Sequence, residues 1–472
     1  MRKIFFLILV QSLLLNYGNA QTFQVDTLQY KGNTNKYINF VIMGDGYTIS
    51  QQSNFITDAT NLSNHLLAQS PWSNYINYFN VFAIRVISSQ SGATHPGTAS
   101  DCSSASPPVP FSNPTTYLGC SFDSYGIHRL VVPNNTSNIV NVLSTNFPNY
   151  DQVFVIANSP YYGGSGGSYA NATSTTDSNS PEICAHEMGH SFANLADEYY
   201  AGDVYAAEKP NMTQQTYSAL VKWTNWMGYN GIWIYPHCCG GQSALWYKPD
   251  NNCKMQYLGS PYCYVCAEAI IERIHSLVNT IVSYTPTTLN ISSPNQYLNF
   301  KLSVLIKPIP NTLNIVWKLD GTSVLNNADS IQIDQNTLAI GTHTLTTTVV
   351  DTTTLVRVNN HSTIHFSTVK WTINKTATGI QLTSTDNKII YSIFPNPSSN
   401  ILNISVESDK QGGKISIQIV SLDGKIIQQV ANEALVDGKY LNAINVEHLT
   451  KGTYFILFKS QDAEQTLSFI KQ

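Results

Sequence analysis

Residues 186–190 read His-Glu-Met-Gly-His, and this spacing constrains the chain more than any other feature. Residues four apart on a helix share one face, so the imidazoles of His186 and His190 would project together. Two imidazoles so placed can hold one zinc ion, and Glu187 would then stand where it can take a proton from water beside the metal. The alternative is a structural helix with two incidental histidines. Ser180 and Pro181 begin a helix in the right place, which favours the metal site.

A catalytic zinc ion needs a third protein ligand and leaves one position open to water. The helix is expected to end near Asn194, a residue that tolerates the left-handed conformation, and the chain then offers Asp197 and Glu198. A carboxylate is an acceptable zinc ligand. From the spacing of the turn we predict Asp197 as the third ligand, with Glu198 as the alternative. The carboxylate that does not bind can orient a histidine.

The first residues have the pattern of a secretory signal. Arg2 and Lys3 precede a mostly apolar run over residues 4–15 that is too short to span a bilayer, and Gly18 and Ala20 supply small residues before a cleavage site. We therefore predict a signal peptide over residues 1–20, and hence a secreted or cell-surface protein. No later segment is expected to cross a membrane as a helix.

Composition excludes one class of partner. Charged residues make up 11% of the chain, against about 25% in a typical soluble protein. The net charge is -4 and no basic stripe appears, so nothing favours binding to nucleic acid.

The eight cysteines all lie between Cys102 and Cys266. Residues 263–266 could form a redox motif or half of a zinc ribbon, but export favours structural disulfides. Cys102 and Cys120 could close a surface loop, and the cysteines at 238, 239, 253, 263 and 266 crowd a second region. Their pairing does not follow from the sequence.

The chain divides into blocks. Residues 21–283 mix strands, expected at 37–43, 79–87 and 153–158, with helices, expected at 53–69, around residue 186 and at 264–282. Alternating strands such as 313–319 and 342–350 predict an immunoglobulin-like β-sandwich over residues 284–375. A linker over 376–389 and a second β domain over 390–472 complete the chain. We thus expect an α/β (α+β) catalytic domain followed by two small all-β sandwich domains.

The zinc helix resembles that of the metzincin peptidases, whose pattern is HExxHxxGxxH. Residues 194–197 are similar to the last step of this pattern, with one extra residue and with Asp197 in place of the histidine. Metzincins place a methionine turn beneath the zinc, and Met255 stands at the expected place, before the last helix of the block. Ordinary core packing is the alternative role for Met255. A tyrosine two residues after this methionine supports the oxyanion in some metzincins, which makes Tyr257 a candidate catalytic residue.

The block as a whole resembles the IgA peptidase family of zinc metallopeptidases, over about residues 25–375. The resemblance rests on residues 44–48, 162–167, 186–199, 253–255 and 263–266. Two departures, at Ala193 and Asn194 and at residues 238–241, bear on loop shape and substrate choice. The glycine-rich residues 162–167 are either a flexible loop or an edge strand that pairs with an extended peptide. Asp45 is expected to be a structural turn residue.

The last block is similar to the sorting domain of the type IX secretion system, through residues 394–400 and 451–455. The resemblance implies passage across the outer membrane by the type IX machinery and removal of the domain. One more β-sandwich for binding is the alternative.

These features together predict a secreted zinc endopeptidase that acts on extracellular proteins, with immunoglobulin or mucin-like glycoproteins as possible substrates. The family name alone is no evidence that immunoglobulin A is cut. The rival class is a surface adhesin with a structural or vestigial metal site. A zinc amidase acting on glycans or cell wall is a weaker third class, because no carbohydrate motif appears.

Overall fold

The computed structural model describes residues 21–174, 179–293, 295–305, 307–376, 380–383, 389–409, 413–460 and 464–472. The expected signal peptide, residues 1–20, lies outside this range. No helix among the described residues is long and apolar enough to cross a membrane.

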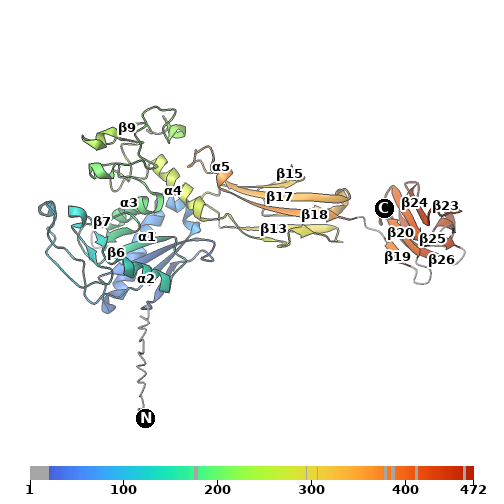
Figure 1. Cartoon of the computed structure of the whole chain (residues 1–472), viewed down its shortest axis with the longest axis horizontal. Helices are drawn as coiled ribbons and strands as arrows, with labels where there is room; N and C mark the ends of the chain where they lie inside the picture. Colours follow the sequence, from blue (N-terminus) through green and yellow to red (C-terminus); the bar gives the residue numbers. More distant parts are fainter. Residues whose placement is uncertain are drawn as a thin grey trace, which may run out of the picture.

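A mixed sheet organises the N-terminal block (Figure 1). Its strand order among the described residues is β1 (Val25–Gln29), β3 (Phe79–Ile84), β2 (Ile38–Asp45), β6 (Gln152–Ala157), β8 (Ala170–Thr173) and β7 (Gly164–Ser165). The four central strands run parallel, and the two edge strands run antiparallel to their neighbours. Every residue of β2, β3 and β6 is buried, as expected for parallel strands covered on both faces.

Helices cover both faces of this sheet. Phe40 and Ile42 of β2 face a core shared with α1 (Gln52–Ala68), α3 (Ser180–Ala193) and α4 (Tyr264–Leu277). Their neighbours Val41 and Met43 point to the opposite face, where α2 (Thr136–Asn146) packs. Figure 1 shows α1 and α3 on one side of β6 and α2 on the other. The period-two alternation of strand side chains thus supplies two separate cores.

The predicted strands and helices of this block are present, with shifted ends. The helix expected over 264–282 ends at Leu277, and β11 (Ile281–Thr285) follows it. The β-branched residues Val278, Thr280 and Ile281 favour an extended chain. Thr280 is also held by Ser367, whose Oγ accepts from its backbone N at 3.1 Å and lies 2.7 Å from its hydroxyl. Helix α3 begins at Ser180, and its N-cap is Asn179, whereas the sequence favours Ser180 as the N-cap.

Two further sheets form the predicted sandwich. One contains β11, β13 (Tyr297–Val304) and β16 (Ser330–Asp334), and the other contains β12 (Asn290–Ile291), β18 (Phe366–Lys375), β17 (Gly341–Asp351), β14 (Leu313–Leu319) and β15 (Thr322–Asn326). Trp317 and Trp371 stack in its core, with ring centroids 5.9 Å apart. A short helix, α5 (His361–Ile364), precedes β18. Asp351 ties the sandwich to the first block, because its carboxylate accepts from Tyr75 at 2.6 Å and lies 2.9 Å from His275 Nε2.

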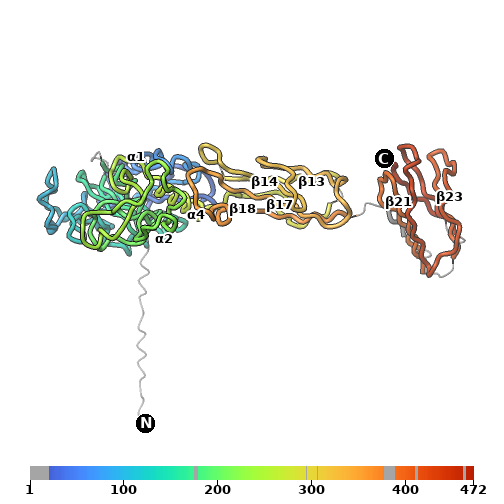
Figure 2. Tube along the Cα trace, turned by 90° about the horizontal axis from the view of Figure 1, so that it is seen from above, coloured from blue at the N-terminus to red at the C-terminus, as the bar shows by residue number. Residues whose placement is uncertain are grey.

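The C-terminal strands form a body with its own core (Figures 1 and 2). Among the described residues, one of its sheets contains β19 (Ile380–Thr383), β20 (Ile389–Phe394), β21 (Ile401–Ser408) and β24 (Lys439–Asn445). The other sheet contains β23 (Ile426–Ala434), β22 (Lys414–Val420), β25 (Gly452–Ser460) and β26 (Glu464–Lys471). Strand β19 lies inside the expected linker, and it pairs antiparallel with β20. Residues 377–379 and 384–388 of that linker lie outside the described part.

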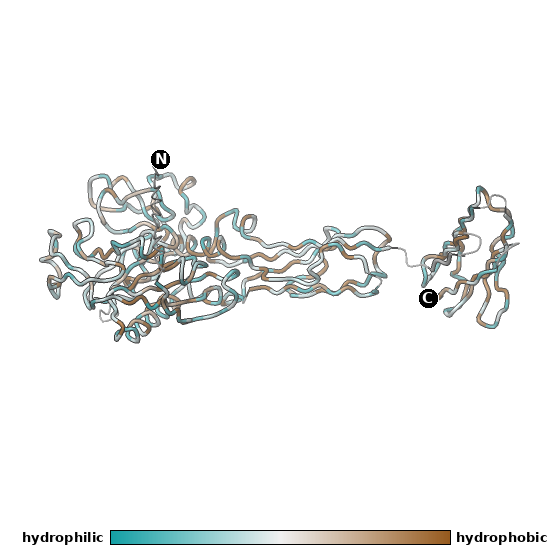
Figure 3. Tube along the Cα trace, turned by 60° about the horizontal axis from the view of Figure 1, so that its bottom comes forward, coloured by the Kyte–Doolittle hydropathy of each residue, from teal (hydrophilic) through white to brown (hydrophobic). Residues whose placement is uncertain are grey.

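The remaining strands are short and sit in long connections. They are β4 (Cys120–Ser121), β5 (Val132–Pro133), β9 (Tyr235–Pro236) and β10 (Tyr247–Lys248). Figure 3 shows hydrophobic and hydrophilic segments interspersed along the whole trace. Asp45, at the end of β2, organises one of these connections. Its buried carboxylate accepts from the backbone N–H groups of Leu118 and Cys120, both at 2.7 Å, which agrees with the expected structural role.

Candidate metal centre

Helix α3 carries the sequence motif on a buried face. His186 and Glu187 are at most 9% exposed. The helix ends at Asn194, which adopts the predicted left-handed conformation with φ of 54°. Its backbone N–H donates to His190 O at 2.9 Å, and this left-handed turn directs the following residues back along the helix.

The turn brings Asp197 onto the two histidines. Asp197 Oδ1 lies 3.0 Å from His186 Nε2 and 3.1 Å from His190 Nε2, and the two nitrogens are 3.1 Å apart. Zinc bonds of about 2.0–2.2 Å to nitrogen and oxygen place tetrahedral neighbours about 3.3–3.5 Å apart. The three donor atoms therefore form a triangle only slightly tighter than one face of such a tetrahedron.

Backbone carbonyls orient both imidazoles. His186 Nδ1 lies 3.0 Å from Lys254 O, and His190 Nδ1 lies 2.8 Å from Leu195 O. A carbonyl only accepts, so each Nδ1 carries a proton, and each Nε2 can bind a metal ion once it has lost its own proton. Metal-binding histidines commonly use their second nitrogen in this way.

The electrostatics of the three groups also fit a cation. Burial opposes ionisation of Asp197, but the neighbouring His190 and His186 outweigh it and hold the pKa of Asp197 far below its usual range. Burial likewise opposes protonation of His190, yet the Asp197 carboxylate raises the pKa of His190 to about 9. A cluster that retains a proton so firmly stabilises positive charge between its donors.

Glu198 occupies different surroundings. Its Oε1 accepts from Asn211 Nδ2 at 2.9 Å and from Cys266 Sγ at 3.3 Å. Burial raises the pKa of Glu198 well above its usual value. The structure therefore brings Asp197, and not Glu198, to the histidines.

Met255 lies directly beneath the helix. It is fully buried, and a Cβ atom added to Gly189 would lie 2.6 Å from Met255 Sδ. The adjoining Lys254 carbonyl orients His186, as described above. The absence of a side chain at Gly189 thus allows the methionine to approach the motif helix closely.

A cavity of about 260 Å³ opens beside the motif. Glu187, Arg129 and Tyr199 are among the residues that line it. The Tyr199 ring lies 6.0 Å from the His186 ring, and the Arg129 guanidinium lies 5.8 Å from the centre of the Tyr199 ring.

The predicted Tyr257 is 53% exposed and is not among the residues that line the cavity. Sequence reasoning missed Tyr199 and Arg129. Tyr199 directly follows the two candidate carboxylates, which was an available signal, whereas Arg129 lies in an irregular connection without one.

Edge strand β7 passes close over the same helix. A Cβ atom at Gly166, just beyond the strand, would lie 2.5 Å from His190 Cβ and 2.9 Å from Glu187 Oε2. On its outer side, Gly164 N donates to Arg129 O at 3.1 Å, and Gly164 O accepts from Val131 N at 3.3 Å. Part of the glycine-rich segment is therefore an edge strand, whose outer edge is already engaged at Gly164.

The predicted disulfides do not form as expected. Cys102 and Cys120 are both free, since Cys120 is buried beside Asp45 and Cys102 faces His95 and Asp123. The thiols of residues 253, 263 and 266 are free and buried, and Cys253 Sγ lies 3.6 Å from Cys266 Sγ. The disulfide found among the described residues joins the neighbours Cys238 and Cys239.

Three of the solved structures that match this chain resemble it weakly. Dimeric latent PorU from Porphyromonas gingivalis has 12% identity over 41% of this chain and 20% of that chain, with a TM-score of 0.16. SGBP-B from the mixed-linkage glucan utilization locus of Bacteroides ovatus has 12% identity over 41% of this chain and 68% of that chain, with a TM-score of 0.14, and a beta-glycosidase from Bacteroides vulgatus has 7% identity over 43% and 26%, with a TM-score of 0.15. The present chain thus spans one fifth of the PorU chain. A search of curated proteins finds no match.

Family models match two regions. Residues 27–234 match the IgA peptidase M64 model, which includes the whole HExxH segment and Asp197. Residues 392–472 match the model of a secretion system C-terminal sorting domain. The first match ends before Met255 and does not reach residue 375, where the sequence resemblance was expected to end. Over residues 27–234 the chain is therefore similar to the IgA peptidase M64 family, and over residues 392–472 it is similar to a C-terminal sorting domain for secretion.

Proposed function

We propose that this chain is a secreted zinc endopeptidase that hydrolyses peptide bonds of extracellular proteins. The observation that carries the proposal is the triangle of His186 Nε2, His190 Nε2 and Asp197 Oδ1 beside a cavity lined by Glu187. The sorting domain at residues 392–472 supports delivery to the outside of the cell by the type IX secretion machinery. Immunoglobulin and mucin-like glycoproteins are candidate substrates.

The three donor atoms are the proposed zinc ligands. A bound zinc ion supplies a Lewis acid that polarises a substrate carbonyl and acidifies water. A structural zinc site has four protein ligands, whereas a catalytic site has three and an open position. Three donors beside a cavity therefore favour catalysis over the rival class, an adhesin with a structural metal.

Glu187 is the proposed general base. Its carboxylate lies within 4.8 Å of a ring nitrogen of each histidine, and Glu187 lines the cavity. In this role Glu187 accepts a proton from the attacking water and then donates it to the nitrogen of the leaving amine. The closeness of Gly166 to Oε2 restricts where this carboxylate can lie.

We propose that Met255 forms the methionine turn of a metzincin-like site. It packs against Gly189 between the two histidines, and the carbonyl of the preceding Lys254 orients His186. The proposed fold of residues 21–283 is accordingly metzincin-like.

A first test replaces the proposed base. We expect Glu187→Gln to keep the zinc content of the parent and to lower turnover of casein by about 10²–10⁴-fold, because the amide cannot accept the proton. His186→Ala should lose both zinc and activity. Zinc content by mass spectrometry and casein digestion, with and without chelator, are the measurements. Full activity of Glu187→Gln would refute the mechanism, and an inactive parent that retains zinc would favour the binding protein.

Two tyrosines, Tyr199 and Tyr257, are candidates for stabilising the oxyanion that forms during peptide hydrolysis. Tyr257 was the candidate from sequence, but it does not line the cavity, whereas Tyr199 and Arg129 are among the donors that do. We assign the stabilisation of the developing oxyanion to Tyr199, with Arg129 beside it.

The matched variants are Tyr199→Phe and Tyr257→Phe, which each remove one hydroxyl. Loss of a donor to an oxyanion costs about 10²–10³-fold in kcat, which we expect for Tyr199→Phe with little change in KM. Tyr257→Phe should retain parental kcat. Steady-state cleavage of a fluorogenic peptide measures both, and a large loss of kcat in Tyr257→Phe alone would reverse the assignment.

Two adjacent glycines provide a steric test of the cleft. A methyl group at Gly166 would overlap with His190 Cβ and Glu187 Oε2, whereas a Cβ atom at Gly167 meets nothing within 4 Å. We expect Gly166→Ala to lower kcat/KM by about 10²-fold, as misplaced catalytic groups do. Gly167→Ala should stay near the parent. Equal losses in the two variants would mean that flexibility of the segment, and not the close approach at Gly166, matters.

A further inference from the structure

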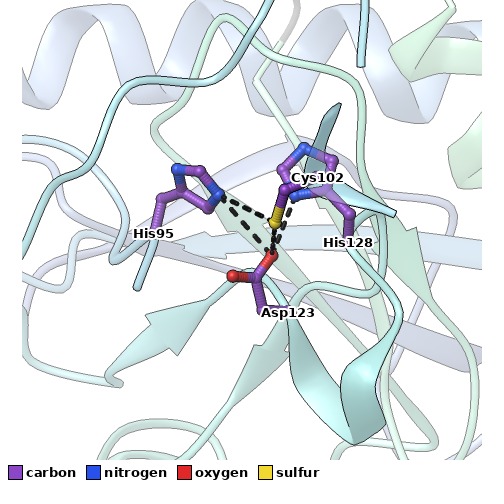
Figure 4. Close-up of side chains that lie close together, drawn as sticks. All are labelled: His95, Cys102, Asp123 and His128. Atoms are coloured by element: carbon purple, nitrogen blue, oxygen red, sulfur yellow. Dashed lines mark hydrogen bonds and ion pairs between the residues drawn. The ribbon is translucent and has the colours of Figure 1, made fainter. Parts of the chain in front are cut away.

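A second cluster of metal-binding side chains lies in the long connection between β3 and β5. His95, Cys102, Asp123 and His128 point toward one another, and their donor atoms lie within 4.8 Å of one another (Figure 4). Apart from the two-residue strand β4, this connection contains only short 3-10 helices among its regular elements. Yet the side chains of His95, Asp123 and His128 are no more than 7% exposed.

The distances between the donor atoms match those around a tetrahedral ion. Cys102 Sγ lies 3.7 Å from His95 Nε2 and 3.4 Å from Asp123 Oδ1, and His95 Nε2 lies 3.6 Å from the same oxygen. Zinc bonds of about 2.3 Å to sulfur and about 2.0–2.2 Å to nitrogen and oxygen place tetrahedral neighbours about 3.3–3.6 Å apart. His128 Nδ1 lies closer to Asp123 Oδ1, at 2.8 Å.

Groups outside the cluster orient two of the donors. His95 Nδ1 lies 2.9 Å from Pro110 O, so it carries the proton and Nε2 presents a lone pair to the other donors. Asp123 Oδ2 accepts from Thr98 N at 2.6 Å, which leaves Oδ1 to face inward. Cys102 has no disulfide partner among the described residues, so its sulfur is available as a thiolate ligand.

We propose that His95, Cys102, Asp123 and His128 bind a structural zinc ion, separate from the ion at His186 and His190. Four protein ligands fill a tetrahedral site and leave no position for water, which is typical of structural zinc. A mixture of thiolate, imidazole and carboxylate suits zinc, whereas a copper site of the His₂Cys type has a weak thioether or carbonyl in place of the carboxylate.

The ion would fix a segment that reaches the proposed catalytic cavity. Arg129 directly follows His128, lines that cavity and accepts the Gly164 N–H through its carbonyl oxygen. On the other side, Pro110 and Ser112 line a larger cavity of about 730 Å³, and both contact His95. A bound ion would add a cross-link to a long connection that contains little regular secondary structure.

The test compares zinc content in the full chain. We expect Cys102→Ala to contain one zinc equivalent less than the parent, His186→Ala to lose a different equivalent, and the double variant to lose two. Cys184→Ala removes a buried thiol that has no part in either site and should keep the parental content. The zinc lost in Cys102→Ala and the zinc lost in His186→Ala are measured independently. If His186→Ala keeps its zinc, the zinc content of Cys102→Ala still tests the second site, and the reverse holds as well.

Cobalt substitution identifies the sulfur ligand in chains that remain folded. The proposed catalytic site has no thiolate, so a thiolate-to-cobalt charge-transfer band that disappears in Cys102→Ala reports the second site. Cys102→His supplies an alternative ligand and should retain the metal equivalent while losing this part of the band. Parental zinc content in Cys102→Ala, an unchanged band in Cys102→His, or copper in the parent at this site would each overturn the proposal.

Discussion

The carboxylate of Asp197, held between the imidazoles of His186 and His190, is the interaction on which the site depends. The two histidines alone would present only two donor nitrogens, 3.1 Å apart. Asp197 adds a third donor atom, because the left-handed residue Asn194 reverses the chain at the end of α3. Without that turn the carboxylate would continue away from the helix, and the cluster would lack its third donor.

The surroundings of this triangle restrict its geometry from several directions. The carbonyls of Lys254 and Leu195 fix the imidazoles, and Met255 packs against Gly189 from below. Above the helix, Gly166 passes so close that a single methyl group would meet both His190 and Glu187. Each contact comes from a different part of the chain, so the sheet and its helices must be assembled before the donors are aligned.

Sequence alone could predict the parts of this arrangement that depend on local periodicity. The spacing of residues 186 and 190 predicts a shared helical face, and the alternation of residues 313–319 predicts a sandwich strand that the structure contains. The sequence predicts the ends of helices less well than their middles. Residues 278–282 were expected to continue a helix, but hydrogen bonds to β18 and pairing with β13 favour an extended chain there.

Features that depend on distant contacts were out of reach. Arg129 joins the cavity only because the connection around it folds back on β7, and no pattern near it indicates this. The expected bridge between Cys102 and Cys120 followed from compartment and spacing, whereas the fold turns Cys102 toward His95 and Asp123 instead. Sequence thus predicted the motif helix well and the surrounding loops poorly, because loop geometry arises from tertiary hydrogen bonds.

The central claim is that one ion lies between His186, His190 and Asp197. Anomalous diffraction at the zinc absorption edge, from crystals of the purified protein, tests it most directly. The account predicts a peak about 2 Å from His186 Nε2, His190 Nε2 and an Asp197 oxygen. A peak bound by Glu198 in place of Asp197, or no peak at the two histidines in an active protein, would contradict it.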